Sequence, residues 1–277
     1  MKIFLTGGTG FLGSHFLRAA IDADLEIVAL RSPGKKCRLP LASEPLWIDG
    51  TLEEYPSSAL EDVDVLVHLA AHGVNPVNSN WIDCFRCNVT ASLGLWLAAS
   101  EAGVRRYVIA GSCFEYGKSG ENIDFIPTDA PLLPTGPYHS SKAAATMAAL
   151  GFAVDHQREV VVLRPFHIYG EGESPERFWP SLVKAAKEGE DFPMSEGLQV
   201  RDFVSAEQVA SCFLESIFRQ DLVPGKPMIE NVGSGEPKTL IQFAKDEWMS
   251  IGAIGKLLPG IVPTRKNEIM RYVPLLK

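Results

Sequence analysis

The sequence has no long hydrophobic run. Its longest nearly apolar stretch, from Ala143 to Val154, has 12 residues and is interrupted by Thr146, whereas a helix needs about 20 apolar residues to cross a bilayer. At the N-terminus only three apolar residues follow Met1 and Lys2, too few for the core of a secretory signal. We therefore expect neither a membrane span nor a signal peptide.

Cysteine is scarce, with 5 residues in 277. A small odd number fits a reducing compartment, so the sequence predicts a cytoplasmic protein. Cys84 and Cys87 form a CxxC pair, but no second pair and no nearby histidine cluster accompany it. Zinc sites use four ligands and redox CxxC motifs need a thioredoxin-like context, so we predict no metal site. The other cysteines are Cys37, Cys113 and Cys212.

Positive charge is also in deficit. The chain has 26 lysines and arginines against 34 aspartates and glutamates, a net charge of −8. Without a large basic block, this balance disfavours nucleic-acid binding. The remaining composition, 46% hydrophobic and 22% charged, is that of an ordinary globular protein long enough to bury a sizeable core.

The first half of the chain alternates short apolar runs with helical stretches. We expect strands at Lys2–Leu5, Leu25–Leu30, Leu46–Ile48, Val63–Leu69, Arg106–Ala110 and Glu159–Arg164. We expect helices at Phe11–Ile21, Trp81–Ala102 and Pro137–His156. This alternation predicts an α/β fold with a doubly wound, mostly parallel sheet over residues 1–165. Residues 166–277 are irregular in pattern, and we expect a smaller region there, with segments that return to the sheet.

A glycine-rich turn joins the first strand to the first helix. Gly7, Gly10 and Gly13 are spaced GxxGxxG, and glycine lets the backbone approach a pyrophosphate bound at the positive end of the following helix. The motif follows an N-terminal strand and opens an amphipathic helix, which is the context that a dinucleotide site requires. We therefore predict that residues 1–165 are a Rossmann-like dinucleotide-binding domain.

The end of the second strand indicates which dinucleotide binds. An acidic residue there would bind the adenosine ribose hydroxyls of NAD, but this sequence has Arg31, followed by Lys35, Lys36 and Arg38. A guanidinium can hold a 2′-phosphate through two hydrogen bonds. The pattern favours NADP(H) over NAD(H), and a solvated basic loop is the alternative interpretation.

Tyr138 and Lys142 form a YxxxK pair at the start of a predicted helix. A spacing of four places both side chains on one helix face, where the ammonium is expected to lower the pKa of the phenol. The tyrosine can then exchange a proton with a sugar hydroxyl or a ketone while hydride passes to or from a nicotinamide. Ser112 ends the fifth strand and supplies a hydroxyl, so Ser112, Tyr138 and Lys142 are the predicted catalytic residues.

With these motifs the chain resembles the extended short-chain dehydrogenase/reductases, in particular the nucleotide-sugar epimerases, dehydratases and 4-ketoreductases. The matching segments are TGGTGFLG at 6–13, HLAA at 68–71, Asn88, Ser112, Tyr138 with Lys142, LRPFHIYG at 163–170, RDF at 201–203 and NVGSGE at 231–236. The resemblance covers most of the chain. It implies a Rossmann-like sheet with a smaller C-terminal substrate-binding region.

The resemblance also implies which residues hold each ligand. The cofactor-binding set is Gly7, Thr9, Gly10, Phe11, Leu12, Gly13, Arg31, Asp49, Leu69, Ala70, Ala71, Asn88, Tyr138 and Lys142. The substrate-binding set is Cys113, Phe114, His167 and Arg201, with Arg201 on the nucleotide diphosphate. Two helical segments rich in small residues, Ala91–Ala102 and Ala143–Ala153, pair with a second subunit in that family. This implies a homodimer, although packing within one subunit would use the same composition.

The chain departs from the family pattern at three positions. In the 4,6-dehydratases an aspartate and a glutamate follow the serine or threonine, and Cys113 and Phe114 stand there in this chain. Neither can act as the acid or the base in water elimination, so 4,6-dehydration is not expected. His167 stands where asparagine is usual, and it can hold a substrate oxygen, donate a proton or pack.

The leading hypothesis is an NADP(H)-dependent oxidoreductase acting at C4 of a nucleoside-diphosphate sugar, reducing a 4-keto-6-deoxysugar nucleotide. Arg31 favours net reduction, because NADPH is then a consumed substrate. A 4-epimerase with a retained cofactor needs the same three catalytic residues and remains the alternative. The presence of all three disfavours a non-catalytic NADP-sensing regulator, and Arg201 disfavours a reductase of other ketones.

Overall fold

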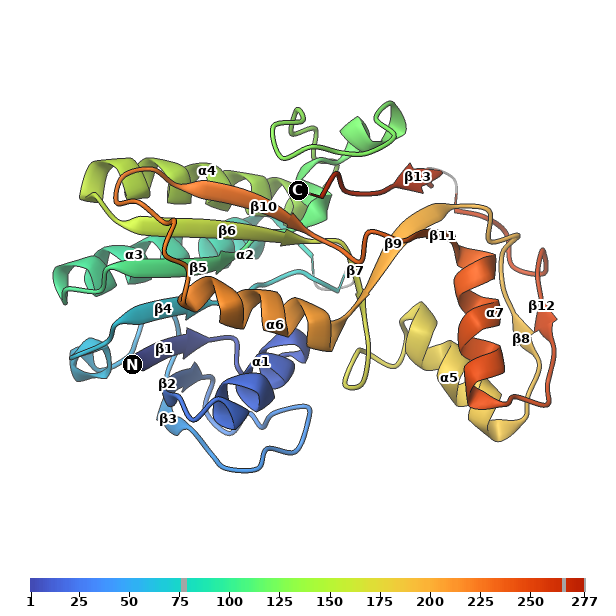
Figure 1. The fold of residues 1–277 in the computed structure, drawn as a ribbon, viewed down its shortest axis with the longest axis horizontal. Helices are drawn as coiled ribbons and strands as arrows, with labels where there is room; N and C mark the ends of the chain where they lie inside the picture. The colour runs from blue at the N-terminus through green and yellow to red at the C-terminus, as the bar shows by residue number, and fades with distance from the viewer. Residues whose placement is uncertain (76–78, 266–267, 277) are drawn as a thin grey trace.

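The computed structural model describes residues 1–75, 79–265 and 268–276. Its centre is a parallel sheet whose strand order, among the described residues, is β10-β6-β5-β4-β1-β2-β3 (Figure 1). The strands are β1 Lys2–Thr6, β2 Glu26–Arg31, β3 Leu46–Asp49, β4 Val65–His68, β5 Arg106–Ala110, β6 Glu159–Pro165 and β10 Met228–Val232. The predicted doubly wound sheet is confirmed. The strand order reverses between β1 and β4, and in such sheets ligands bind outside the carboxyl ends of the strands at that point.

Helices cover both faces of this sheet. They are α1 Phe11–Asp22 and α6 Ala206–Ile217 on one face, and α3 Ser92–Glu101 and α4 Pro137–His156 on the other. Along β1, Ile3 and Leu5 pack with Phe16 of α1, whereas Phe4 packs with Trp96 of α3. Each such side chain contributes about 1.5–3 kcal/mol by leaving water. None of the described helices is long and apolar enough to span a membrane.

The long helix expected at Trp81–Ala102 is not uniform. It consists of α2 Trp81–Phe85, a wide π-helical turn η3 Arg86–Ala91, and then α3. Within the wide turn, the Ser92 hydroxyl donates to the carbonyl of Cys87 at 2.9 Å, and Asn88 is buried. Hydrophobic spacing does not distinguish a π turn from an α turn, so the sequence could not locate this irregularity.

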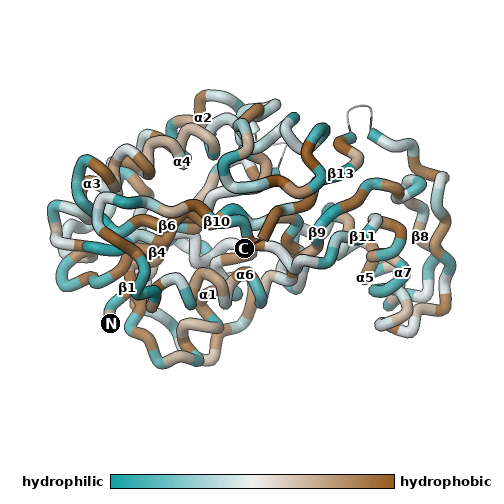
Figure 2. Tube along the Cα trace, turned by 45° about the horizontal axis from the view of Figure 1, so that its top comes forward, coloured by the Kyte–Doolittle hydropathy of each residue, from teal (hydrophilic) through white to brown (hydrophobic). Residues whose placement is uncertain are grey.

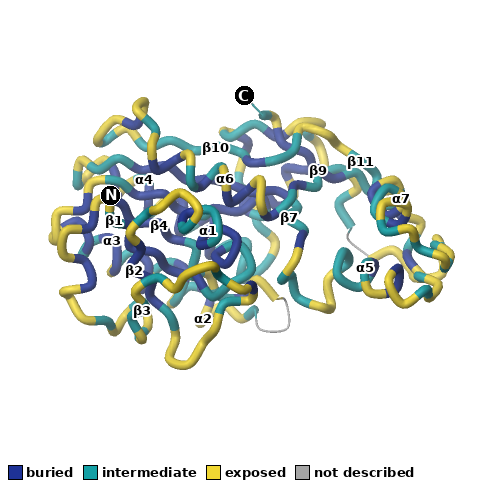
Figure 3. Tube along the Cα trace, turned by 60° about the horizontal axis from the view of Figure 1, so that its bottom comes forward, coloured by how far each residue is buried: buried dark blue, intermediate teal, exposed yellow. Residues whose placement is uncertain are grey.

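The region after residue 165 is built on a smaller sheet. Strand β9 (Val200–Ser205) pairs with β7 (His167–Tyr169), β11 (Pro237–Thr239) and β13 (Arg271–Tyr272). Beyond it lie α5 Phe178–Glu188, α7 Leu240–Ile251 and the short strands β8 Phe192–Pro193 and β12 Leu257–Leu258. Figure 2 shows hydrophobic stretches along the central strands, and Figure 3 shows the buried chain concentrated there, with more exposed chain around α5 and α7. Because β10 belongs to the central sheet, this part of the chain crosses back over the carboxyl edge.

Candidate active site

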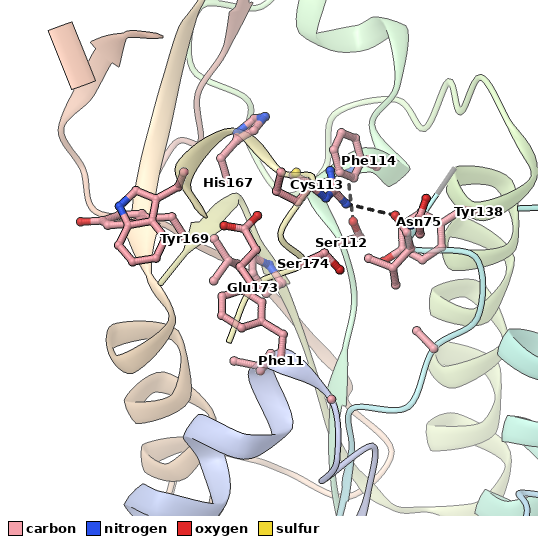
Figure 4. Close-up of a pocket in the computed structure, with 18 of the residues that line it drawn as sticks. Phe11, Asn75, Ser112, Cys113, Phe114, Tyr138, His167, Tyr169, Glu173 and Ser174 are labelled. Carbon is pink, nitrogen blue, oxygen red and sulfur yellow. Dashed lines mark hydrogen bonds between the residues drawn. The ribbon is translucent and has the colours of Figure 1, made fainter. Parts of the chain in front are cut away.

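A cavity of about 1020 Å³ lies at the carboxyl edge of the sheet, between the β1–α1 turn and the smaller sheet. Most of the predicted site residues line it: Gly7, Thr9, Gly10, Phe11, Leu12, Gly13, Arg31, Leu69, Ala70, Ala71, Ser112, Cys113, Phe114, Tyr138, Lys142, His167 and Arg201. Figure 4 shows that residues from distant parts of the chain project into this one space. Asp49 and Asn88 are not among its lining residues.

The glycine turn leaves room for a dinucleotide by keeping side chains out. Gly7 has φ +78° and a Cβ there would meet the Ala70 amide nitrogen at 2.5 Å. A Cβ on Gly13 would lie 2.0 Å from the Gly7 carbonyl oxygen. Helix α1 begins directly after Gly10, so its free N–H groups and positive end face the cavity. This cradle fits a pyrophosphate, as the sequence predicted.

The basic residues expected at the adenosine end are placed differently from one another. Arg31 donates to Asp49 through Nε at 2.7 Å, and its guanidinium lies 4.9 Å from the centre of the Trp47 ring. Arg38 lines the cavity, but Lys35 and Lys36 do not. Part of the charge that was predicted to meet a 2′-phosphate is therefore already neutralised by Asp49, whose position beside Arg31 follows from the pairing of β2 with β3.

Ser112, Tyr138 and Lys142 meet at one side of the cavity. The Lys142 ammonium is buried and donates to the carbonyl of Ala110 at 2.5 Å. Burial raises the pKa of Tyr138, and a hydrogen bond with Ser112 only partly offsets this. The expected lowering of the Tyr138 pKa by Lys142 is therefore wrong for this arrangement, in which desolvation dominates. A phenol that keeps its proton is suited to donate it.

A buried ion pair that the sequence analysis missed supports the catalytic serine. Glu115 accepts from the backbone N–H of Ser112 at 2.8 Å and from Arg164 Nε at 2.8 Å. Glu115 and Arg164 are 0% and 1% exposed, and Arg164 also donates to the Tyr116 hydroxyl at 2.9 Å. The signal was present, because serine followed three residues later by glutamate is a capping-box pattern. The pair fixes the backbone that presents the Ser112 hydroxyl.

Asn88 braces the cavity from outside. Its side chain accepts from the His72 N–H at 2.7 Å and donates to the His72 carbonyl at 3.0 Å and to the Ser141 hydroxyl at 2.9 Å. These bonds tie η3 to α4 and to the loop after β4. A direct contact of Asn88 with the cofactor stays a prediction, as does one for Asp49.

The opposite side of the cavity carries rings and paired charges. Phe114 stacks on His139 with ring centres 4.9 Å apart, and Phe203 stacks on Phe243 at 4.0 Å. The Arg201 guanidinium forms an ion pair with Glu268. Because Arg201 is only 7% exposed, a diphosphate that binds it must share or displace that carboxylate.

Two buried groups beside these rings are uncharged. Burial, with Arg201 and Arg177 nearby, lowers the pKa of His167 to about 3, so its imidazole is neutral. Burial raises the pKa of the Cys113 thiol well above its usual range. Cys113 is 2% exposed, so neither group supplies a charge to a bound ligand at neutral pH.

Cysteine and histidine do not gather into a metal centre in the described ranges, where no group of three or more His, Cys, Asp or Glu side chains has suitable geometry. Cys84 is buried, and its thiol lies 3.9 Å from the carbonyl oxygen of His72. All five cysteines are unbridged.

Comparison with known proteins identifies the family. The model of the NAD-dependent epimerase/dehydratase family matches residues 3–233. The chain belongs to this family. The predicted resemblance is thereby confirmed, and with it an enzyme class that uses a nicotinamide cofactor.

Individual relatives of this family member act on different nucleotide sugars. The chain is 28% identical to the dTDP-D-glucose 4,6-dehydratase of Mus musculus over 262 residues, which cover 88% of this chain and 71% of the relative. It is 26% identical to the CDP-abequose synthase of Salmonella muenchen over 283 residues, covering 97% and 87%. The structure of MoeE5 in complex with UDP-glucose and NAD has a TM-score of 0.83 and 27% identity, covering 100% of this chain and 90% of that one.

Proposed function

We propose that this protein is an NADP(H)-dependent reductase acting at C4 of a 4-keto-6-deoxysugar linked to a nucleoside diphosphate. One observation carries the proposal: Ser112, Tyr138 and Lys142 line the same cavity as the glycine turn and Arg201. A cofactor on the glycine turn and a diphosphate on Arg201 would bring nicotinamide and sugar together beside Tyr138. The alignment over 97% of the chain with a CDP-abequose synthase supports a sugar bound to a nucleotide.

In this mechanism the bound nicotinamide supplies hydride to the sugar carbon. Tyr138 donates its phenolic proton to the oxygen at C4, and the raised pKa of Tyr138 keeps that proton available. Ser112 donates a hydrogen bond to the same oxygen, on a backbone fixed by Glu115. The buried ammonium of Lys142 stabilises the phenolate that remains after proton transfer.

The two side chains that follow Ser112 support reduction without dehydration. Water elimination needs an acid and a base beside the sugar, and the Cys113 thiol stays protonated because burial raises its pKa. Phe114 contributes a ring stacked on His139 and has no proton to exchange. We therefore propose that this family member does not carry out 4,6-dehydration, although one of its relatives does so by name.

The proposed preference for NADP(H) rests on the adenosine end of the cavity. No acidic side chain ends β2, and Arg31 and Arg38 both line the cavity. Asp49 opposes this preference, because it already occupies the Arg31 guanidinium at 2.7 Å. A 2′-phosphate would have to bind the remaining face of Arg31 together with Arg38.

We also propose a homodimer in the cytoplasm. The outer surfaces of α2 and α4 expose large apolar side chains, namely Trp81, Ile82, Met147 and Val154. Such side chains gain stability when a second subunit covers them. Size measurement by light scattering should give a dimer for the wild type and a monomer for Met147→Glu.

The proposal is tested by incubating the purified protein with NADPH and nucleotide 4-keto-6-deoxysugars that differ in their base. We expect loss of reduced nicotinamide absorbance together with formation of a 4-hydroxy sugar. Formation of a new sugar without loss of NADPH would instead establish the 4-epimerase, which needs only Ser112, Tyr138 and Lys142. Tight NADPH binding with no turnover of any sugar would establish the regulator.

A further inference from the structure

Glu173 lies in the loop after β7, and its side chain points into the cavity between Phe11 and His167 (Figure 4). Its carboxylate oxygen Oε2 is buried and has no hydrogen-bond partner among the residues that the structure describes. The ring nitrogen Nδ1 of His167 is unpartnered in the same sense and belongs to the same cavity. Leaving buried polar atoms unpaired is destabilising, so a ligand that pairs with them is favoured.

The backbone on both sides holds Glu173 in this position. His15 of α1 donates through Nε2 to the carbonyl of Glu171 at 2.9 Å. Arg38 donates to the carbonyl of Gly172 at 2.8 Å, and Gly172 has φ +82°, which favours glycine. The loop is therefore fixed to the nucleotide-binding half, and the Glu173 side chain is directed inward by the main chain.

The charged neighbours of Glu173 do not neutralise its burial. Desolvation raises the pKa of Glu173 to about 7, although the cations Arg177 of the same loop and Arg38 of the loop after β2 lower it. His167 on β7 faces it as a neutral ring, so the imidazole adds no positive charge.

Further from Glu173, the groups on β9 and η4 add little free charge. Arg201 on β9 is paired with Glu268, and the thiol of Cys113 on η4 (Cys113–Glu115) is protonated. A dinucleotide and a nucleotide sugar would bring additional phosphate charges into the cavity. Negative charge nearby favours the uncharged form of a carboxyl group.

We propose that Glu173 binds the nucleotide sugar as a neutral carboxylic acid that donates its proton in a hydrogen bond to a ligand oxygen. Binding then takes up one proton from solution when Glu173 starts as a carboxylate, and the same proton is released when the ligand leaves. This inference rests on the proposed function, since it needs a nucleotide sugar in this cavity. It makes Glu173 a binding residue that selects for ligand through its protonation.

The test measures binding of UDP-glucose by calorimetry at about pH 6 and about pH 8.5, because its diphosphate diester does not titrate in that interval. With a Glu173 pKa of about 7 in the free protein, the wild type should bind about 30-fold more weakly at the higher pH. Glu173→Gln keeps a donor without a charge, and its affinity should change by less than about threefold. Glu171→Gln, an exposed change in the same loop, should keep the wild-type dependence on pH.

Repeating the titration in buffers of different ionisation enthalpy counts the protons directly. We expect uptake of about one proton at high pH for the wild type and near zero for Glu173→Gln. UDP-glucose binding without proton uptake, or a Glu173→Gln variant with the wild-type pH dependence, would overturn the role of Glu173 and leave the proposed function standing. If UDP-, dTDP-, CDP- and GDP-sugars all failed to bind the wild type at either pH, the proposed function itself would be contradicted, and this inference with it.

Discussion

The two sides of the active-site cavity are built from different materials. On the cofactor side the main chain does most of the work, since Gly7 and Gly13 let backbone segments approach within distances that no side chain would allow. On the substrate side, side chains define the space, through ring pairs such as Phe203 with Phe243 and through the Arg201–Glu268 ion pair. Changes on the cofactor side should therefore be nearly all-or-none, whereas changes on the substrate side should be graded.

The largest effect is expected for Gly13→Val. The added atoms would lie about 2.0 Å from the Gly7 carbonyl oxygen, so the turn must open and cofactor binding should be lost. Gly151→Ala is the control, because a Cβ there meets nothing within 4 Å and alanine in a helix should stabilise by about 0.5–1 kcal/mol. Thermal unfolding with and without NADPH measures both. A Gly13→Val protein that binds NADPH normally would show that the turn is not the cofactor cradle.

The next largest effect concerns turnover. Tyr138→Phe removes the proton donor and leaves the ring, so we expect turnover to fall by about 10²–10⁴ while NADPH and nucleotide-sugar affinities stay near wild type. Ser112→Ala should cost less, since it removes a hydrogen bond and not the proton. Single-turnover kinetics measures both variants. Near wild-type turnover by Tyr138→Phe would mean that another group supplies the proton, and His167 would be tested next.

Graded behaviour on the substrate side is probed by two changes at one ion pair. Arg201→Ala should raise the KM for the nucleotide sugar by about 10- to 100-fold, the loss of one charged hydrogen bond of about 1.5–3 kcal/mol. Glu268→Gln should lower KM, because it removes the carboxylate that competes for the guanidinium. Steady-state kinetics at saturating NADPH distinguishes the models. An increase in KM in both variants would indicate that the ion pair is only structural.

The smallest effect is expected at the adenosine end, where Arg31 is partly exposed and shared with Asp49. Arg31→Asp should weaken NADPH binding by about 1–2 kcal/mol, at the low end for a charged hydrogen bond because solvent screens it. Asp49→Asn should strengthen NADPH binding relative to NADH, since a negative charge beside the 2′-phosphate is removed. Fluorescence titrations with both cofactors give the ratio. Unchanged NADPH affinity in Arg31→Asp would refute the assignment of Arg31 to the 2′-phosphate.

The same contrast explains how much of the molecule the sequence could predict. Strand and helix order up to residue 165 followed from local apolar patterns, and Gly7, Gly10 and Gly13 identified the cofactor cradle. These features depend on residues close together in the chain. The π turn at η3 did not follow, because it depends on contacts of Asn88 with His72 and Ser141 across distant segments.

On the substrate side, pairing between distant residues decided the outcome. Arg201 was predicted as a ligand contact, but its partner Glu268 lies 67 positions away, and no local pattern links the two. Glu173 was missed for the same reason: its burial depends on His15 and Arg38 holding the loop. Charges and hydrogen bonds of this kind need the fold before they can be assigned.

The central claim is that hydride passes from a cofactor on the glycine turn to C4 of a nucleotide sugar held by the opposite side. Its most direct test supplies NADPH carrying deuterium at the nicotinamide C4 position, in both stereochemical forms, with the 4-keto-6-deoxysugar nucleotide that the panel identifies. Mass and NMR spectra of the product then locate the label. We predict one deuterium at C4 of the sugar from one of the two forms and none from the other. A reduced sugar without deuterium from either form would contradict direct hydride transfer in this cavity.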